Sequence, residues 1–141
     1  MKNPAAKRIG RLLGLGYKSW QVQTYARLAL SGHPKLRQSH SPVFRFIEPN
    51  GSRIVDLAAK AGMTKQSMTY LVRSLESAGY VVTTPDPADG RARLVNLTDA
   101  GIDAEAALAR ISLDLEAELV LRLDEEKVER LRALLAELLD E

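Results

Sequence analysis

Two short amphipathic segments, joined by a glycine-containing turn, are the clearest pattern in the middle of the chain. In the first, apolar residues recur at the three- and four-residue spacing of one helix face: Ile54, Leu57, Ala58 and Ala61. Ser52 stands where it can cap this helix, and Gly62 stands where it can end it. The second begins after Thr64, a typical cap, stops at Gly79, and carries Met68, Leu71, Val72 and Leu75 on one face. Two helices joined so tightly predict a helix-turn-helix.

The pattern then changes from helical to extended. Residues 80–84 and 93–97 are β-branched and apolar runs, and residues 85–90 between them are rich in proline, aspartate and glycine. This arrangement predicts a β-hairpin with a long loop. A helix-turn-helix followed by a hairpin is a winged helix.

The flanking segments predict further helices. Residues 7–30 have apolar positions at roughly helical spacing, although three glycines weaken that pattern, and residues 31–42 read as a loop before a short helix or turn. Thr98 with Asp99 caps a long helix that extends to residue 123, and Asp124 caps a last one. Both C-terminal helices are apolar on more than one side, which requires more than one partner surface. We therefore expect a homodimer whose terminal helices interleave.

The resulting fold class is mainly α with a small β-hairpin. We divide the chain into an N-terminal dimerisation helix with its connecting loop and helix (1–50), a winged helix-turn-helix domain (51–98) and C-terminal dimerisation helices (99–141).

Charge is distributed unevenly along the chain. Residues 1–50 hold nine Lys and Arg against one acidic residue, whereas residues 102–141 hold five against twelve. Either the basic front binds a polyanion, or the two ends lie against each other. The chain has no cysteine, which excludes disulfides and zinc–cysteine sites within it. No apolar run reaches the ~20 residues of a membrane span, and the N-terminus lacks a signal-peptide pattern, so we expect a cytoplasmic protein without a membrane partner.

The non-core face of the second middle helix has the chemistry of a DNA-reading surface. Gln66 can pair with adenine, Lys65 or Arg73 can meet guanine or phosphate, and hydroxyl groups can meet phosphate oxygens. The candidate contacts are Thr64, Lys65, Gln66, Ser67, Thr69, Tyr70 and Arg73. The alternative is an ordinary solvated helix face.

The hairpin adds four candidate DNA contacts. Arg91, beside Gly90, can extend into a minor groove, and Asp89 can orient it; the alternative is that Asp89 and Arg91 only brace the hairpin. Arg93 can contact DNA or merely flank its strand. Arg53 is a possible phosphate clamp or a solvated arginine.

The segment from Asp56 to Gly101 resembles the MarR family of bacterial transcription regulators. The resemblance rests on Leu57-Ala58, on Leu75-Glu76 followed by Gly79 and Val81, on the Asp-Pro, Asp89 and Arg91 of the wing, and on Leu97-Thr98 with Gly101. It implies a homodimer on a pseudo-palindromic DNA operator, usually a repressor, released by a small and often aromatic ligand. One departure is that Thr83 and Thr84 stand where many relatives carry arginine.

The remaining features are less specific. Several residues could line an effector pocket or simply be core and dimer contacts: Tyr17, Trp20, Tyr25, His40, Phe44 and Phe46. His33 and His40 make a poor metal site, and we expect them to be capping or solvent-exposed. We expect no metal, no cofactor and no enzymatic activity. The rival function is a winged helix that serves as a protein-interaction or RNA-binding module.

Overall fold

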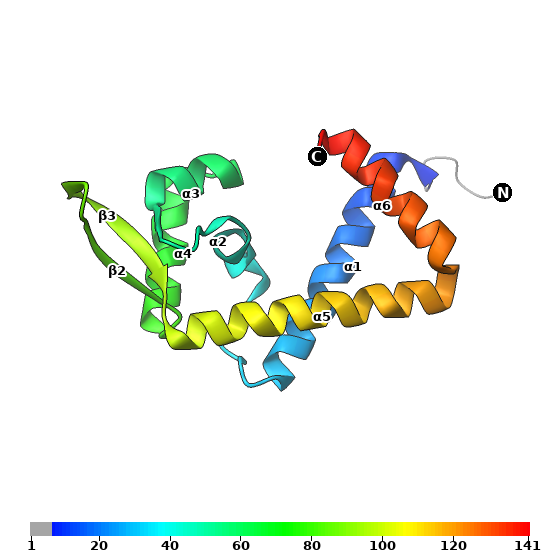
Figure 1. Ribbon diagram of the computed structural model, residues 1–141, viewed down its shortest axis with the longest axis horizontal. Coiled ribbons are helices and arrows are strands. Elements are labelled where there is room, and N and C mark those ends of the chain that lie inside the picture. The colour runs from blue at the N-terminus through cyan, green and yellow to red at the C-terminus, as the bar shows by residue number, and fades with distance from the viewer. Residues whose placement is uncertain (1–6) are drawn as a thin grey trace. The chain divides into compact units, whose positions relative to one another are not determined.

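A computed structural model describes residues 7–141, so the first six residues of the predicted N-terminal segment lie outside it (Figure 1). Its elements are α1 (Ile9–Leu30), the 3-10 turn η2 (Gln38–His40), α2 (Ser41–Phe46), β1 (Ser52–Arg53), α3 (Ile54–Ala61), α4 (Lys65–Ser77), β2 (Val81–Asp86), β3 (Asp89–Leu97), α5 (Asp99–Leu123) and α6 (Glu125–Leu139). The chain divides within α5 into two compact units, one up to Leu108 and the other from Ala109. The three-part division made from the sequence stays a prediction.

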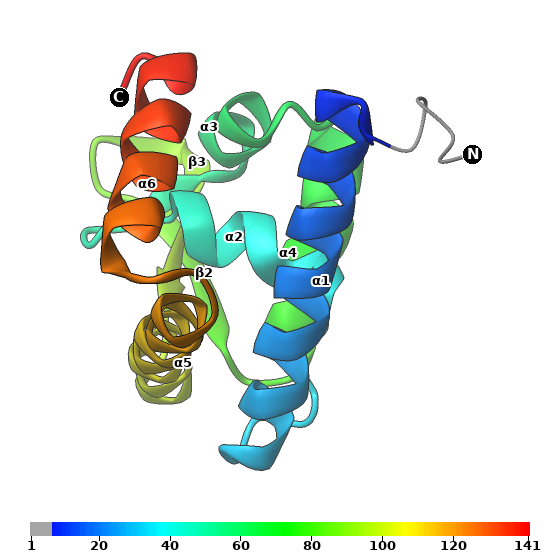
Figure 2. The ribbon, with the colours of Figure 1, turned by 90° about the vertical axis from the view of Figure 1, so that its right-hand side faces the viewer.

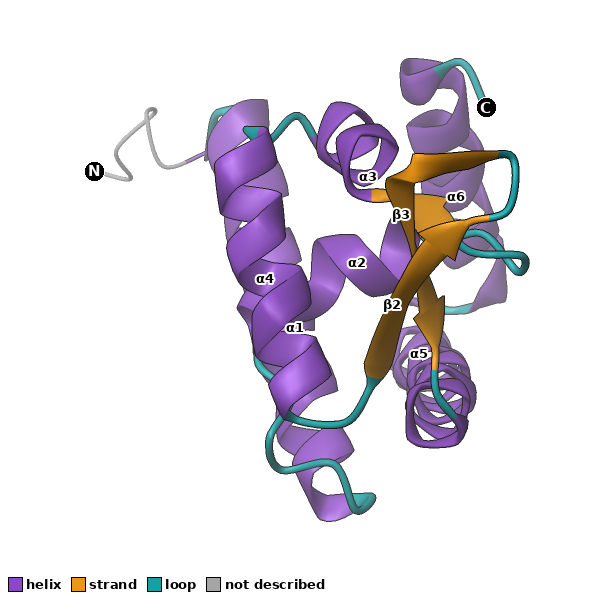
Figure 3. Cartoon of the chain, turned by 90° about the vertical axis from the view of Figure 1, so that its left-hand side faces the viewer, coloured by secondary structure: helices purple, strands orange, loops and turns teal. Residues whose placement is uncertain are grey.

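The first unit contains a winged helix with a three-stranded antiparallel sheet in the order β1-β3-β2 (Figure 3). The short strand β1 pairs Ser52 with Val95, an addition that the sequence did not indicate. The predicted long hairpin loop is wrong, because the strands continue to Asp86 and Asp89 and leave a two-residue turn. The register shift after Pro85 absorbs the extra residues of β3 as an irregularity in the ladder.

Helix caps explain where α3 and α4 begin. The predicted cap at Ser52 is wrong: its hydroxyl accepts the backbone N–H of Glu48 at 2.9 Å, and α3 starts after Arg53 without a side-chain cap. Thr64 does cap α4, since its hydroxyl accepts the N–H of Ser67 at 3.1 Å. The turn between the two helices is therefore fixed by Gly62 at one end and Thr64 at the other.

The predicted apolar face of α4 lies in the core. Met68, Leu71, Val72 and Leu75 are all buried, as are Leu57 of α3 and Val81 and Val95 of the sheet. Burial of each such side chain contributes roughly 1.5–3 kcal/mol. The opposite face of α4 is exposed to solvent.

Helix α1 forms over 22 residues and includes all three glycines, none of which has a positive φ or a neighbouring atom within 4 Å of an added Cβ. Residues 41–46 form α2, which runs across the direction of α1 in Figure 2. The loop expected over residues 31–42 therefore ends earlier, since η2 and the start of α2 occupy its second half. Pro42 lies in the first turn of α2, where its missing N–H costs nothing.

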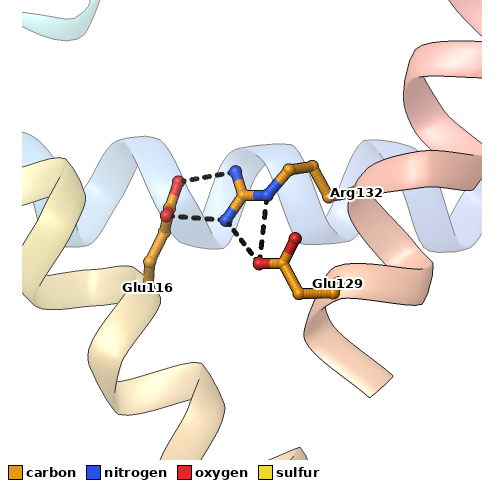
Figure 4. A network of polar contacts seen from close by, with 3 residues as sticks. All are labelled: Glu116, Glu129 and Arg132. Atoms are coloured by element: carbon orange, nitrogen blue, oxygen red, sulfur yellow. Dashed lines mark hydrogen bonds and ion pairs between the residues drawn. The ribbon is translucent and has the colours of Figure 1, made fainter. Parts of the chain in front are cut away.

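In the second unit, Arg132 links α5 to α6 (Figure 4). Its guanidinium group donates to both carboxylate oxygens of Glu116, at 2.9 and 3.4 Å, and to Glu129. The hydrogen bonds and charge of Arg132 lower the pKa of Glu116. As predicted, Asp124 caps α6 by accepting the N–H of Lys127. No helix within residues 7–141 is long and apolar enough to cross a membrane.

Candidate nucleic-acid interface

The exposed face of α4 carries the polar residues that the sequence singled out. Lys65, Gln66, Tyr70 and Arg73 are all exposed, and 74% of Tyr70 is accessible to solvent. Gln66, Tyr70 and Arg73 are spaced about one helical turn apart and form a ridge opposite Met68 and Leu75, and Lys65 lies beside it at the start of the helix. The guanidinium, ammonium, amide and phenol groups on this ridge are the donors and acceptors that meet base edges and phosphates.

Three hydroxyls on the same helix are engaged by the protein itself. Thr64 caps the helix and donates its own proton to Ser67 Oγ at 3.0 Å. Thr69 donates to the carbonyl oxygen of Lys65 at 2.7 Å. These contacts order the first turns of α4. The protons of the Thr64 and Thr69 hydroxyls are used within the protein, so only the Ser67 hydroxyl keeps a proton that it can donate to a phosphate oxygen.

The wing presents Arg91 on an exposed stretch of β3. Asp89 accepts the backbone N–H of Arg91 at 3.1 Å, so it fixes the backbone beside the arginine. Within residues 7–141 the Arg91 guanidinium forms no ion pair, in contrast to the bracing alternative. Gly90 has an ordinary φ and open space around it, so its backbone does not require glycine.

Arg93 has a structural contact across the hairpin. Its guanidinium donates to the carbonyl oxygen of Thr83 at 3.0 Å. The Thr83 hydroxyl in turn donates to Glu76 at 2.5 Å, which ties the only acidic residue of α4 to the base of the wing. The negative charge of Glu76 is thus held at the C-terminal end of α4 by its bond to the wing, one helical turn after Arg73.

Arg53 and Asp86 form the tightest ion pair of the wing. The Arg53 nitrogens lie 2.6 and 2.7 Å from one oxygen of Asp86, whose other oxygen accepts the N–H of Ala88. The Ala88 N–H and the Arg53 guanidinium together lower the pKa of Asp86. Arg53 therefore anchors the two-residue turn to β1, and its availability as a phosphate clamp stays a prediction.

The candidate ligand residues do not share one environment. Tyr17 is half exposed, and its hydroxyl accepts hydrogen bonds from Arg45 at 2.7 Å and from Gln21 at 2.6 Å. Burial alone would raise the pKa of Tyr17, but these hydrogen bonds, with Ser41, lower it. Trp20 and Phe46 are partly buried. Tyr25, His40 and Phe44 are buried, and burial raises the pKa of Tyr25 to about 12.

Both histidines are buried, so the expectation of solvent exposure is wrong. His40 does act as a cap: its Nδ1 accepts the N–H of Arg37 at 3.0 Å, while its Nε2 donates to Ser74 on α4 at 2.9 Å. Burial, followed by the charge of Arg37, lowers the pKa of His40. His33 contacts Tyr80 and Asp103. No cluster of potential metal ligands occurs among the described residues.

Sequence reasoning missed three residues with well-defined roles. The sequence indicates Asp86 as part of the turn and of the Asp-Pro pair in the MarR resemblance, without its ion pair, and it does not single out Arg45 or Asp103. A signal existed for Asp86, since an aspartate before a proline in a predicted hairpin can bind backbone N–H groups of the turn. Arg45 and Asp103 depend on tertiary contacts that no local pattern encodes.

The helix-turn-helix, its hairpin wing and the polar ridge of α4 define a winged helix-turn-helix protein. Residues 35–92 match the model of the MarR family. The chain is 36% identical over 61 residues to the transcriptional activatory protein BadR of Rhodopseudomonas palustris, covering 43% of this chain and 35% of that protein. It is 33% identical over 88 residues to an uncharacterised HTH-type transcriptional regulator of Mycobacterium leprae, covering 60% and 62%. The chain thus spans about a third and three fifths of the lengths of these relatives.

The fold extends the likeness beyond the matched segment. The transcriptional repressor CouR, solved bound to a 23-mer DNA duplex, superposes with a TM-score of 0.76 at 19% identity, covering 98% of this chain and 96% of CouR. At this identity the likeness concerns the fold alone. Residues 35–92 therefore match the MarR family, as the sequence indicated, and the fold over nearly the whole chain is similar to that of CouR.

Proposed function

We propose that this chain is a cytoplasmic transcriptional regulator that binds duplex DNA, with α4 in the major groove and the wing at the adjacent minor groove. The observation that carries the proposal is the ridge of Lys65, Gln66, Tyr70 and Arg73, exposed on a helix whose other face is locked in the core. Arg91 extends the same chemistry to the wing, where a narrow minor groove attracts guanidinium groups. The DNA-bound structure of CouR supports this use of the fold.

The proposed active form is a homodimer on a pseudo-palindromic operator. Exposed apolar side chains support it: α1 presents Ile9, Leu12, Leu13 and Leu15, and α6 presents Leu131, Leu134, Leu138 and Leu139. Exposed apolar side chains gathered on one helix usually mark an interface. A twofold dimer places one α4 in each of two major grooves one helical turn apart, which a pseudo-palindrome matches.

We propose repression as the regulatory outcome, because a dimer spanning two grooves blocks access to a promoter. The names of the relatives include both an activatory protein and a repressor. A promoter–reporter fusion distinguishes the two: loss of the chain raises expression in repression and lowers it in activation.

A small aromatic ligand is the proposed release signal. Tyr17, with Arg45 5.6 Å from its ring centroid, offers an aromatic face and a cation at a half-exposed position. A thermal-shift screen with aromatic acids tests this proposal. Stabilisation by a ligand that also releases DNA, and its loss in Arg45→Ala, are expected; a complete absence of stabilising ligands contradicts it.

Salt-dependent binding to duplex DNA tests the regulatory function itself. Duplexes selected by the protein from a randomised library are titrated by fluorescence anisotropy at increasing salt. Neutralisation of several phosphates makes the logarithm of the association constant fall with the logarithm of salt, by roughly 0.9 per phosphate. Failure to select any sequence, or equal binding to single-stranded RNA, favours the RNA-binding or protein-interaction module instead.

A further inference from the structure

In the first unit, α1 and α4 each end at a glycine, and the residues that follow, His33 and Tyr80, contact each other through their side chains. After α1, Gly32 adopts φ 98° and the N–H of His33 returns to the carbonyl oxygen of Leu28 at 3.1 Å. After α4, Gly79 adopts φ 87° and the N–H of Tyr80 returns to the carbonyl oxygen of Leu75 at 2.9 Å. Both turns have the 6→1 hydrogen bond of a Schellman motif, and the turn after α4 also has its 5→2 bond, from Gly79 to Glu76. The local sequences Leu-Ser-Gly-His and Ser-Ala-Gly-Tyr thus determine the backbone positions from which His33 and Tyr80 make their tertiary contact.

His33 joins these two helix ends to the beginning of α5. Its Nδ1 lies 3.0 Å from the hydroxyl of Tyr80, and its Nε2 lies 2.7 Å from Oδ2 of Asp103. The rings of His33 and Tyr80 also meet edge to face, with centroids 5.5 Å apart. His33 and Tyr80 are almost fully buried, whereas the Asp103 side chain is 68% exposed.

The hydrogen-bonding chemistry assigns a direction to each bond. The ionised Asp103 carboxylate only accepts, so Nε2 of His33 carries a proton. In the neutral ring, Nδ1 then accepts the proton of the Tyr80 hydroxyl. Among the described residues no buried side-chain nitrogen or oxygen lacks a partner. Both ring nitrogens of His33 are therefore hydrogen-bonded, Nδ1 to Tyr80 and Nε2 to Asp103, so neither is available to bind a metal.

Thr98 binds the same turn from its other side. Its N–H donates to the carbonyl oxygen of Tyr80 at 3.0 Å, and its hydroxyl donates to that of Gly79 at 2.6 Å. The same hydroxyl accepts the N–H of Gly101 at 3.2 Å, which caps α5. The start of α5 is thus held to the end of α4 by Thr98 on one side and by Asp103, through His33, on the other.

We propose that His33 is a positioning residue for DNA recognition: by binding Tyr80 and Asp103 it fixes the direction in which α5 leaves the DNA-binding elements. The inference rests on the proposed DNA-binding dimer. Since α5 runs on from this junction into the second unit, the junction determines how rigidly each DNA-binding unit is attached. A rigid attachment presents the second α4 to its half-site once the first is bound, whereas a loose one lowers its effective concentration.

The test compares four variants on two DNA probes. The probes are the two-half-site duplex that the wild-type protein selects from a randomised library, and a duplex holding one of its half-sites. Asp103→Asn weakens the link at an exposed position, because a neutral amide oxygen is a poorer acceptor than a carboxylate, and His33→Ala removes both bonds. Asp103→Glu keeps the carboxylate. Glu105→Gln, exposed on the same helix, matches the charge change alone.

We expect the preference for two half-sites over one to fall about threefold in Asp103→Asn, because the hydrogen bond persists but loses its charge assistance at a partly exposed position. In His33→Ala it falls on the order of tenfold, since buried Tyr80 also loses its partner. Affinity for one half-site changes less than about twofold, Asp103→Glu retains the wild-type preference, and Glu105→Gln does not alter it. A preference in Asp103→Asn and His33→Ala equal to that of Glu105→Gln overturns the inference while leaving DNA binding intact.

Amide hydrogen exchange gives a readout without DNA. The N–H groups of Thr98 and Ile102, which bond within the junction, are expected to exchange about threefold faster in Asp103→Asn than in Glu105→Gln. If the wild-type protein selects no duplex, the DNA-binding proposal fails and the positioning role fails with it. Unchanged exchange in both Asp103→Asn and His33→Ala refutes the link itself, whatever the DNA result.

Discussion

Replacement of Gly101 by alanine tests how tightly α5 is joined to the DNA-binding elements. A Cβ atom at residue 101 would lie 2.2 Å from the carbonyl oxygen of Tyr80 and 3.1 Å from two side-chain carbons of Leu97. The carbonyl oxygen of Tyr80 already accepts the N–H of Thr98 at 3.0 Å, so it cannot retreat without straining that bond. The helical backbone at residue 101 would by itself favour alanine by ~1 kcal/mol, so helix propensity and the clash predict opposite signs.

The expected cost of Gly101→Ala follows from these contacts. Overpacking typically costs about 1–3 kcal/mol, and a weakened hydrogen bond adds about 1 kcal/mol. The net destabilisation, after subtracting the gain in helix propensity, is about 1–3 kcal/mol, which corresponds to a fall in Tm of roughly 3–12 °C.

Thermal unfolding followed by circular dichroism at equal protein concentration measures the change. Gly90→Ala is the matched control, because Gly90 has open space and an ordinary φ, and its Tm should stay within roughly 2 °C of the wild-type value. A Gly101→Ala protein that melts at or above the wild-type temperature would refute the close approach of α5 to Tyr80.

Three further predictions concern other parts of the chain. Thr64→Ala should destabilise the protein by about 1 kcal/mol in urea unfolding while Thr64→Ser does not, because serine retains the cap of α4; equal loss in both would contradict the capping role. The pKa of His40 is lowered in the folded protein, so as the pH falls below the ordinary histidine value of 6.5 the unfolded chain takes up a proton before the folded chain does. The free energy of unfolding should therefore decrease as the pH falls below 6.5. His40→Gln should flatten that part of the stability–pH curve, and an unaltered curve would exclude His40 as its cause. Leu131→Asp should convert a dimer to monomers by light scattering, whereas Arg130→Asp, its exposed neighbour on α6, should not; a dimeric Leu131→Asp protein would rule out the proposed interface.

The fold was predictable where local chemistry determines it. Thr64 and Asp124 cap their helices as expected, because an N-cap bond spans only three residues. The apolar residues of α3 and α4 recur every three or four positions and so lie on one face of each helix, and that face packs in the core. Ser52 failed as a cap because the N–H of Glu48, part of the preceding turn, captures its hydroxyl. The hairpin loop was overestimated because prolines and aspartates can occupy strand ends and irregular ladders as well as loops.

The candidate DNA surface was predictable as a set of exposed residues, and less so in its individual bonds. The spacing around Met68 and Leu75 determines that Gln66, Tyr70 and Arg73 face solvent. It contains no information on the pairing of Arg53 with Asp86, which joins residues 33 positions apart. The link from His33 to Asp103 spans 70 positions, and only its two glycine-terminated helix ends are visible in the sequence.

The dependence of DNA affinity on salt, compared between the wild-type chain and single arginine variants, tests the central claim most directly. If α4 and the wing contact duplex DNA, Arg73→Ala and Arg91→Ala each weaken binding and make the slope of log K against log salt shallower by about one where the arginine meets a phosphate. Arg110→Ala, which removes the same charge from an exposed position on α5, leaves the slope unchanged. Equal slopes and affinities in all three variants, or a wild-type protein whose binding does not respond to salt, would contradict DNA recognition by this surface.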